Sequence, residues 1–179
     1  MLMTLAVTAS LVLTGAHTDT QSLSFRGATI KVPAAWKVKK SGFGSVHVIT
    51  GPCSKKAVDC QGFWLHGPQS IKYASEGNPF RVDQPYHPSS GVMECTHDKR
   101  YYSSPLPEKP TVSGLRQVGS GHKAYHREWK ITCHSQQTFK PTKVTYPQRI
   151  WYLPASKILI VDEWSTPGLG AALKRAVWR

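Results

Sequence analysis

Acidic side chains are scarce in this chain of 179 residues. Ten Asp and Glu stand against 23 Lys and Arg, which gives a formal net charge of +13 and an isoelectric point near 9.8. A surface of this charge binds polyanions. The sequence has no Arg-rich helix and no zinc-finger spacing, so we expect no nucleic-acid partner. The basic residues instead form short clusters, and our candidate anion-binding residues are Lys37, Lys39, Lys40, Lys55 and Lys56.

Recognisable catalytic motifs are also lacking. The chain contains no G-x-S-x-G nucleophile elbow, no H-E-x-x-H metal motif and no Gly-rich phosphate loop or dinucleotide fingerprint. The adjacent Asp162 and Glu163 cannot converge on one bond from a strand, because successive side chains point to opposite faces. We therefore predict no catalytic residue and no cofactor, and a binding domain is the first interpretation.

No Lys or Arg precedes Arg26, yet the chain opens with an uncharged apolar run from Met1 to Ala16 that ends in small residues. This run favours an export signal over a spanning helix, which needs about 20 apolar residues. A start site further upstream would supply the basic residues that such signals usually carry. We predict a signal peptide or membrane segment at 1–16, a polar linker at 17–22 and one domain at 23–179. The protein is then secreted or extracytoplasmic, and a retained segment would tether it to the membrane.

The chain has four cysteines, and four cysteines allow three disulfide connectivities. Nearest pairing joins Cys53 to Cys60 and leaves Cys95 for Cys133, which would stabilise the domain by about 2.5 and about 4 kcal/mol respectively. Zinc is the alternative, although no recognised ligand spacing is present, so we predict disulfides and no metal. The side chains that zinc would draw on are Cys95, His97, His122, His126, Cys133 and His134.

The segment from Tyr125 to Cys133 alternates between apolar and polar residues, which is the periodicity of a strand. Its apolar residues share one face, and the other face is predicted to carry His126, Glu128, Lys130 and His134. A secreted hydrolase could use these histidines as general bases. The simpler interpretation of this candidate polar face is the wet side of a half-exposed sheet.

The predicted fold class is α+β, with a single antiparallel sheet, a C-terminal amphipathic helix packed on one face, and long Gly/Pro-rich loops. Alternation and turn residues predict strands at 23–33, 36–39, 45–50 and 62–66. The apolar run at 157–164 predicts a central strand buried on both faces. The stretch 67–90 predicts an extended surface loop.

The closing segment predicts the helix. Apolar residues follow the i, i+3, i+4, i+7 spacing after a Pro suited to the first helical turn. The residues on this apolar face are Leu169, Ala172, Leu173, Ala176 and Val177. We expect the helix to cover one face of the sheet.

Residues 25–38 begin with a predicted strand that ends in Val32-Pro33, and two small residues and Trp36 follow it. This opening resembles that of PsbP-like domains and of uncharacterised exported bacterial proteins of actinobacterial type. The resemblance implies an antiparallel sheet with helices on its faces, and a protein that docks onto partners. The sequence thus predicts an exported, disulfide-stabilised domain that binds at the cell envelope, with an anionic polymer, a lipid surface or an acidic protein as partner.

Overall fold

The structure is a computed structural model and describes residues 19–179. The predicted export signal at 1–16 lies outside the described residues. The first strand begins at Thr20, within the stretch predicted as a linker. The strands are β1 (Thr20–Phe25), β2 (Ala28–Pro33), β3 (Lys37–Lys40), β4 (Val46–Ile49), β5 (Gly62–His66), β6 (Glu94–Cys95), β7 (Asp98–Tyr102), β8 (Val112–Gln117), β9 (Lys123–Ser135), β10 (Pro141–Leu153), β11 (Ile158–Asp162) and β12 (Val177–Trp178). The helical segments are η1 (Gly42–Gly44), α1 (Pro68–Ile71) and α2 (Leu169–Lys174).

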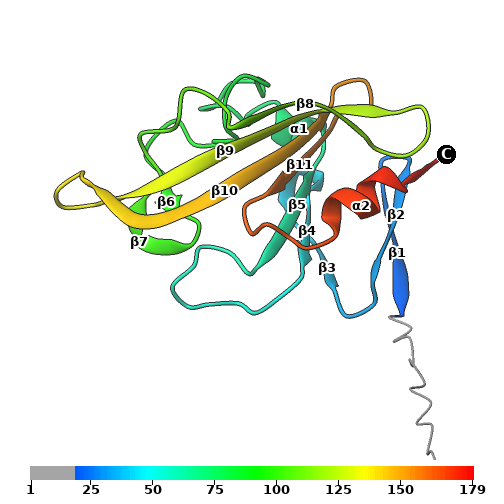
Figure 1. Cartoon of the computed structure of the whole chain (residues 1–179), viewed down its shortest axis with the longest axis horizontal. Coiled ribbons are helices and arrows are strands. Elements are labelled where there is room, and N and C mark those ends of the chain that lie inside the picture. Colours follow the sequence, from blue (N-terminus) through cyan, green and yellow to red (C-terminus); the bar gives the residue numbers. More distant parts are fainter. Residues whose placement is uncertain (1–18) are drawn as a thin grey trace, which may run out of the picture.

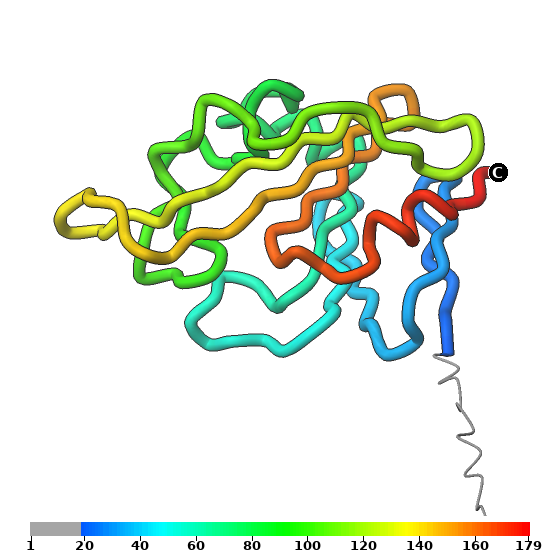
Figure 2. Tube along the Cα trace, viewed as in Figure 1, coloured from blue at the N-terminus to red at the C-terminus, as the bar shows by residue number. Residues whose placement is uncertain are grey.

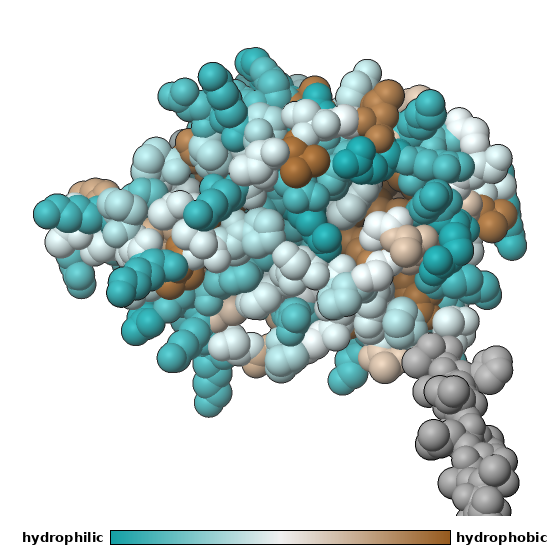
Figure 3. Space-filling view, in the orientation of Figure 1, coloured by the Kyte–Doolittle hydropathy of each residue, from teal (hydrophilic) through white to brown (hydrophobic). Residues whose placement is uncertain are grey.

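The strands form two sheets in which every pairing is antiparallel. The larger sheet has nine strands in the order β3-β4-β5-β11-β10-β9-β7-β6, with β8 paired to β9 off this path. The smaller sheet has the order β1-β2-β12. The long β9–β10 hairpin projects from one end of the molecule, and the small sheet and the C-terminus lie at the other end (Figure 1). Hydrophilic side chains predominate on the face drawn in Figure 3, with small apolar groups between them.

Strand β11 lies at the centre of the larger sheet, between β5 and β10, and all five of its residues are buried. Ile158 and Ile160 contribute to one apolar cluster, whereas Leu159 and Val161 contribute to another. The period of two along the strand divides these side chains between the two faces. The prediction of a central strand that is buried on both faces is confirmed.

The first apolar cluster corrects the predicted fold class. A second sheet, and not a long helix, provides much of the cover: Leu23, Ile30 and Val32 of β1 and β2 pack in this cluster beside the six-residue α2. The α+β architecture with one sheet and a packed amphipathic helix is therefore wrong, and the protein is mainly β.

The helix ends before Val177 because the last residues of the chain form a strand that pairs with β2. Val177, predicted on the apolar helix face, is 64% exposed and belongs to β12, which pairs with β2. Trp178 follows it and donates an indole hydrogen bond of 2.7 Å to the carbonyl of Val118. Backbone pairing and this hydrogen bond satisfy groups that a further helical turn would leave at the surface.

The second apolar cluster lies on the opposite face and is covered by the segment from 67 to 106, whose path Figure 2 traces. Ala74 and Phe80 of this segment are buried against Trp129, Ile131 and other strand residues. The stretch 67–90 is largely an exposed loop, as predicted, but its few buried side chains also cover the core, which the sequence did not indicate. The covering side chains are isolated between Gly, Pro and polar residues, so they leave no periodic signal in the sequence.

Candidate functional site

The predicted anion-binding lysines occupy two elements. Lys37, Lys39 and Lys40 lie on β3, an exposed strand at the edge of the larger sheet. Lysines on an edge strand discourage pairing with other chains, which is a structural reason for their presence. The other two, Lys55 and Lys56, lie in the Cys53–Cys60 loop.

The four residues of the candidate polar face lie on β9, but they do not form one wet side: His126 and His134 are buried, Glu128 is half-buried and Lys130 is exposed. His126 is buried: its Nδ1 is 2.8 Å from the carbonyl oxygen of Ile150 and its Nε2 is 3.0 Å from Oε1 of Glu128. Both ring nitrogens lie within hydrogen-bond distance of a protein acceptor, so the protein already occupies the positions that a substrate would need. Lys130 is exposed, and His134 donates a hydrogen bond of 3.0 Å from Nδ1 to the carbonyl oxygen of Thr132. A pocket of about 270 Å³ adjoins His126 and Glu128, but this arrangement gives little support to the hydrolase interpretation.

The cysteines form two disulfides, Cys53–Cys60 and Cys95–Cys133, so they supply no thiolate to a metal. Within residues 19–179, no cluster of three or more His, Cys, Asp or Glu side chains is placed to hold a metal ion. Over the same range, no helix has the length and apolar character to cross a membrane. Paired cysteines indicate an extracytoplasmic location, because cytosolic thiols are kept reduced.

A groove of about 600 Å³ contains the first feature that sequence reasoning missed. We call it the basic groove, and four side chains define it: Arg26, Phe43, Lys72 and Tyr73. Arg26 lies in the turn between β1 and β2, Phe43 lies in η1, and Lys72 and Tyr73 follow α1. The floor between them is formed by small or uncharged residues, namely Gly44, Gly67, Pro68 and Gln69.

The basic groove combines cations that form no salt bridge with exposed aromatic rings. Arg26 and Lys72 are exposed, make no salt bridge with any described residue, and share the groove with no acidic side chain. The Arg26 guanidinium donates from Nε to the Ser156 carbonyl at 3.0 Å, which leaves its terminal NH₂ groups for an anion. The Lys72 ammonium lies 5.4 Å from the centroid of the Tyr73 ring. Phe43 is 71% exposed and adopts a positive φ of 55°, which is unfavourable for a bulky residue. Neither burial nor backbone preference explains an aromatic side chain there.

A second cavity, of about 360 Å³, adjoins the groove, and Phe43 lines both. We call it the acidic pocket, because Asp59, Glu94 and Glu163 line it and no Lys or Arg does. These residues come from the disulfide loop, from β6 and from the end of β11. Two further lining residues, His66 and Tyr86, stack with their ring centroids 4.8 Å apart.

His66 is the most buried ionisable group of the acidic pocket, with 5% of its surface exposed. Its Nδ1 is 2.9 Å from Ser45 Oγ, which is in turn 2.8 Å from Ser70 Oγ. Its Nε2 is buried and has no hydrogen-bond partner among residues 19–179. Burial lowers the pKa of His66 to about 4, and the nearby His47 acts in the same direction, so the ring is neutral at pH 7.

Glu163 is enclosed by two neutral donors. Thr96 Oγ1 donates to it at 2.7 Å and Gln148 Nε2 at 2.8 Å. Burial raises the pKa of this carboxyl above its ordinary value, because the loss of hydration outweighs the two hydrogen bonds. Burial also raises the pKa of the Tyr86 hydroxyl, and Glu163 and Asp59 add to that effect.

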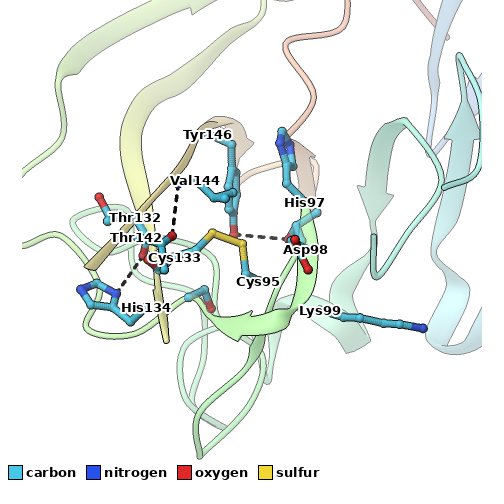
Figure 4. Close-up of a disulfide and its surroundings, with 12 residues drawn as sticks. Cys95, His97, Asp98, Lys99, Thr132, Cys133, His134, Thr142, Val144 and Tyr146 are labelled. Atoms are coloured by element: carbon cyan, nitrogen blue, oxygen red, sulfur yellow. Dashed lines mark hydrogen bonds between the residues drawn. A yellow bond between two sulfur atoms is a disulfide. The ribbon is translucent and has the colours of Figure 1, made fainter. Parts of the chain in front are cut away.

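Both disulfides lie next to residues of the acidic pocket. Asp59 directly precedes Cys60, and Thr96 directly follows Cys95. The two loops are joined by a hydrogen bond of 3.0 Å from the Val58 amide to the Thr96 carbonyl. The rings of Tyr146 and His97 stack 4.5 Å apart near the Cys95–Cys133 bridge (Figure 4). The bridges therefore hold two walls of the pocket in place.

Comparison with known proteins returns no match: no family model, curated protein or solved structure matches this chain. The resemblance to PsbP-like domains stays a prediction.

Proposed function

We propose that this protein binds an anionic polymer of the cell envelope, and that the basic groove is the binding surface. One observation supports this most strongly: two cations without a salt bridge among the described residues, Arg26 and Lys72, and two exposed aromatic rings line a groove with no acidic lining residue. Guanidinium and ammonium groups bind phosphate or carboxylate. Aromatic faces offer flat apolar contact to the repeating units between those charges.

The compartment of the protein limits which polyanions it can meet. The two disulfides are compatible with an oxidising, extracytoplasmic compartment. We propose that the chain is exported and acts at the cell envelope, where the available polyanions are lipid headgroups and phosphate- or carboxylate-bearing polymers. A membrane tether formed by residues 1–16 is the alternative topology, and amino-terminal sequencing of the exported protein distinguishes cleavage from retention.

The shape of the site favours a polymer over a bilayer. The groove is lined by cations from two separate elements, a turn and the residues after a short helix, together with small or uncharged residues. A chain can lie in such a groove and contact both sides, whereas a flat headgroup surface meets only the rim.

The experiment measures the affinity of the purified full-length domain for poly(glycerol phosphate) at low and high salt. The double variant Arg26→Gln/Lys72→Gln is expected to lose about 2 kcal/mol of binding free energy, or about thirty-fold in Kd. Raising the salt concentration should weaken wild-type binding, because the contacts are exposed charge pairs.

The matched control is Lys37→Gln/Lys39→Gln, which removes the same charge from β3. It should bind close to wild type. If the control loses as much affinity as the groove variant, net charge and not the groove explains binding, and the proposal is wrong. Binding to phosphatidylglycerol vesicles without binding to the polymer would also overturn it, in favour of a lipid partner.

A further inference from the structure

The long β9–β10 hairpin ends in a turn that projects from one end of the molecule (Figure 1, and yellow in Figure 2). We call residues 136–140 the hairpin tip. Phe139 of this tip is 70% exposed and has a φ of 54°, a backbone conformation that Asn or Gly adopts more easily. The fold gains neither buried area nor a favourable turn from this ring, which points to a contact outside the chain.

The backbone of the hairpin tip satisfies three consecutive amide groups within the turn. Ser135 accepts all three: its Oγ is 3.3 Å from the amides of Gln137 and Thr138, and its carbonyl oxygen is 2.9 Å from the amide of Phe139. Pro141, directly after the tip, has no amide hydrogen. An unpaired amide is costly away from water, so a turn built in this way can leave water at lower cost than an open loop.

Uncompensated positive charge surrounds the hairpin tip. Lys140 and Lys143 are exposed, and neither forms a salt bridge with a described residue. The same holds for Lys99 on β7, whose carbonyl accepts a hydrogen bond of 3.2 Å from the first residue of the tip. Asp98 beside it is already bound in a salt bridge. Residues 129–161 contain no Asp or Glu, so the hairpin itself does not neutralise these lysines at its tip.

An apolar ring at the end of a basic projection fits a membrane surface that carries anionic lipid. A bilayer can take up a projecting ring at its apolar boundary while lysines beside the ring meet the phosphates. A soluble polyanion would contact the lysines but would gain little from one isolated ring.

We propose that the hairpin tip docks onto an anionic lipid bilayer, with Phe139 entering the headgroup region and Lys140 and Lys143 contacting lipid phosphates. The basic groove uses residues of other elements, so this proposal does not depend on what the groove binds.

The test measures partitioning of the purified protein onto vesicles of phosphatidylglycerol and phosphatidylcholine by co-sedimentation. Phe139→Asn should lower the partition coefficient roughly ten-fold, because the apolar contact is lost. Asn suits the positive φ, so the turn is kept. Phe139→Trp should bind at least as well as wild type. The matched control is Leu115→Thr, which removes a 53% exposed apolar side chain from β8 and should leave partitioning unchanged.

The lysines are tested in the same assay. Lys140→Gln/Lys143→Gln should lower the partition coefficient roughly thirty-fold at low salt, and Lys37→Gln/Lys39→Gln, with the same loss of charge, should lower it clearly less. High salt should reduce the effect of the lysines but preserve the ratio between wild type and Phe139→Asn, because burial of the ring is not screened. Each variant is compared with wild type in the same purified form, so that contributions of the rest of the chain cancel.

Three results would overturn the proposal. Phe139→Asn could bind vesicles like wild type, or lose no more than Leu115→Thr. The two lysine pairs could lose equally, so that net charge alone explains binding. Phe139→Asn could also weaken binding to poly(glycerol phosphate) as much as binding to vesicles, which would show a general polyanion contact. The groove variant Arg26→Gln/Lys72→Gln tests polymer binding separately, so either proposal can fail without the other.

Discussion

Ser45 and His66 face each other across two neighbouring strands, with Oγ and Nδ1 2.9 Å apart. Ser45 directly precedes β4 and His66 ends β5, and the pairing of Val46 with Leu65 brings them opposite each other. This contact occupies one nitrogen of a buried imidazole, and the other, Nε2, is buried without a hydrogen-bond partner among residues 19–179. The strand register thus determines which edge of the His66 ring Ser45 contacts.

The neutral state of His66 makes stability depend on pH. Its pKa is about 4 in the folded protein and 6.5 ordinarily, so the unfolded chain binds more protons between these values. His66 therefore stabilises the fold fully above pH 6.5, and this contribution falls by about 3 kcal/mol as the pH drops to 4. Urea unfolding at pH 7 and pH 4 measures the loss.

The variant His66→Gln serves as the comparison, since Gln does not titrate and can still contact Ser45. Its stability should fall less between pH 7 and pH 4 than that of the wild type. Glu163 acts with the opposite sign in both proteins, because its raised pKa favours the fold at low pH. Equal pH dependence in the wild type and His66→Gln would contradict the buried, neutral state of His66.

The two disulfides should differ in how much they stabilise the fold. Cys95–Cys133 closes a loop with a sequence separation of 38, and Cys53–Cys60 one of 7. Replacing the longer bridge with two alanines should lower the free energy of unfolding by about 4 kcal/mol, and replacing the shorter one by about 2.5 kcal/mol. Unchanged unfolding curves in dithiothreitol would rule out a stabilising role.

Asp162 should be among the most sensitive positions of the core. Its side chain is fully buried, is paired with Arg149 and accepts hydrogen bonds from Thr166 and the Trp164 amide. Asp162→Asn removes the charge that Arg149 requires, so we expect a loss of about 3–5 kcal/mol in the free energy of unfolding. Thermal or urea unfolding measures it. A loss below about 1 kcal/mol would show that Arg149 finds solvent or another partner.

Gly119 tests how closely the C-terminal segment packs. It has a φ of +73°, and a Cβ there would lie 2.3 Å from the carbonyl oxygen of Ala176. Gly121 has a similar φ of +74° but open space around it, which makes Gly121→Ala a matched control. We expect Gly121→Ala to cost about 1 kcal/mol and Gly119→Ala clearly more. Equal costs would mean that the segment around Ala176 moves away freely.

Periodicity in the sequence predicted individual strands, because the burial pattern of a strand is visible in its own residues. The central position of β11, with all five residues buried, matches the structure, because an apolar run of this length is typical of a strand covered on both faces. The alternation along β9 matches from Trp129 to Cys133, but Tyr125 is exposed and His126 is buried, the reverse of the predicted pattern. The predicted C-terminal helix is too long. The helix α2 ends at Lys174, and Val177 instead pairs with β2 as part of β12. Such pairing joins residues far apart in sequence, so no local pattern indicates it.

The candidate site was mostly not predictable from the sequence, because it joins residues that are far apart along the chain. The basic groove joins Arg26, Phe43 and Lys72 from three separate loops, and none of them lies in a charge cluster. One signal was present, an aromatic residue between two glycines at Gly42-Phe43-Gly44, which is an unusual place for a side chain that needs burial. The presence of disulfides was predictable from an even number of cysteines without metal-ligand spacing, but four cysteines allow three connectivities, and the structure supplies the pairing.

The most direct measurement is a residue-by-residue map of amide chemical shifts during titration of the ¹⁵N-labelled protein with poly(glycerol phosphate) at low salt. We expect saturable changes that are largest at Arg26, Phe43, Lys72 and Tyr73 and that disappear at high salt. Changes that are largest on the β3 lysines, or that spread over the surface without saturating, would contradict binding in the basic groove.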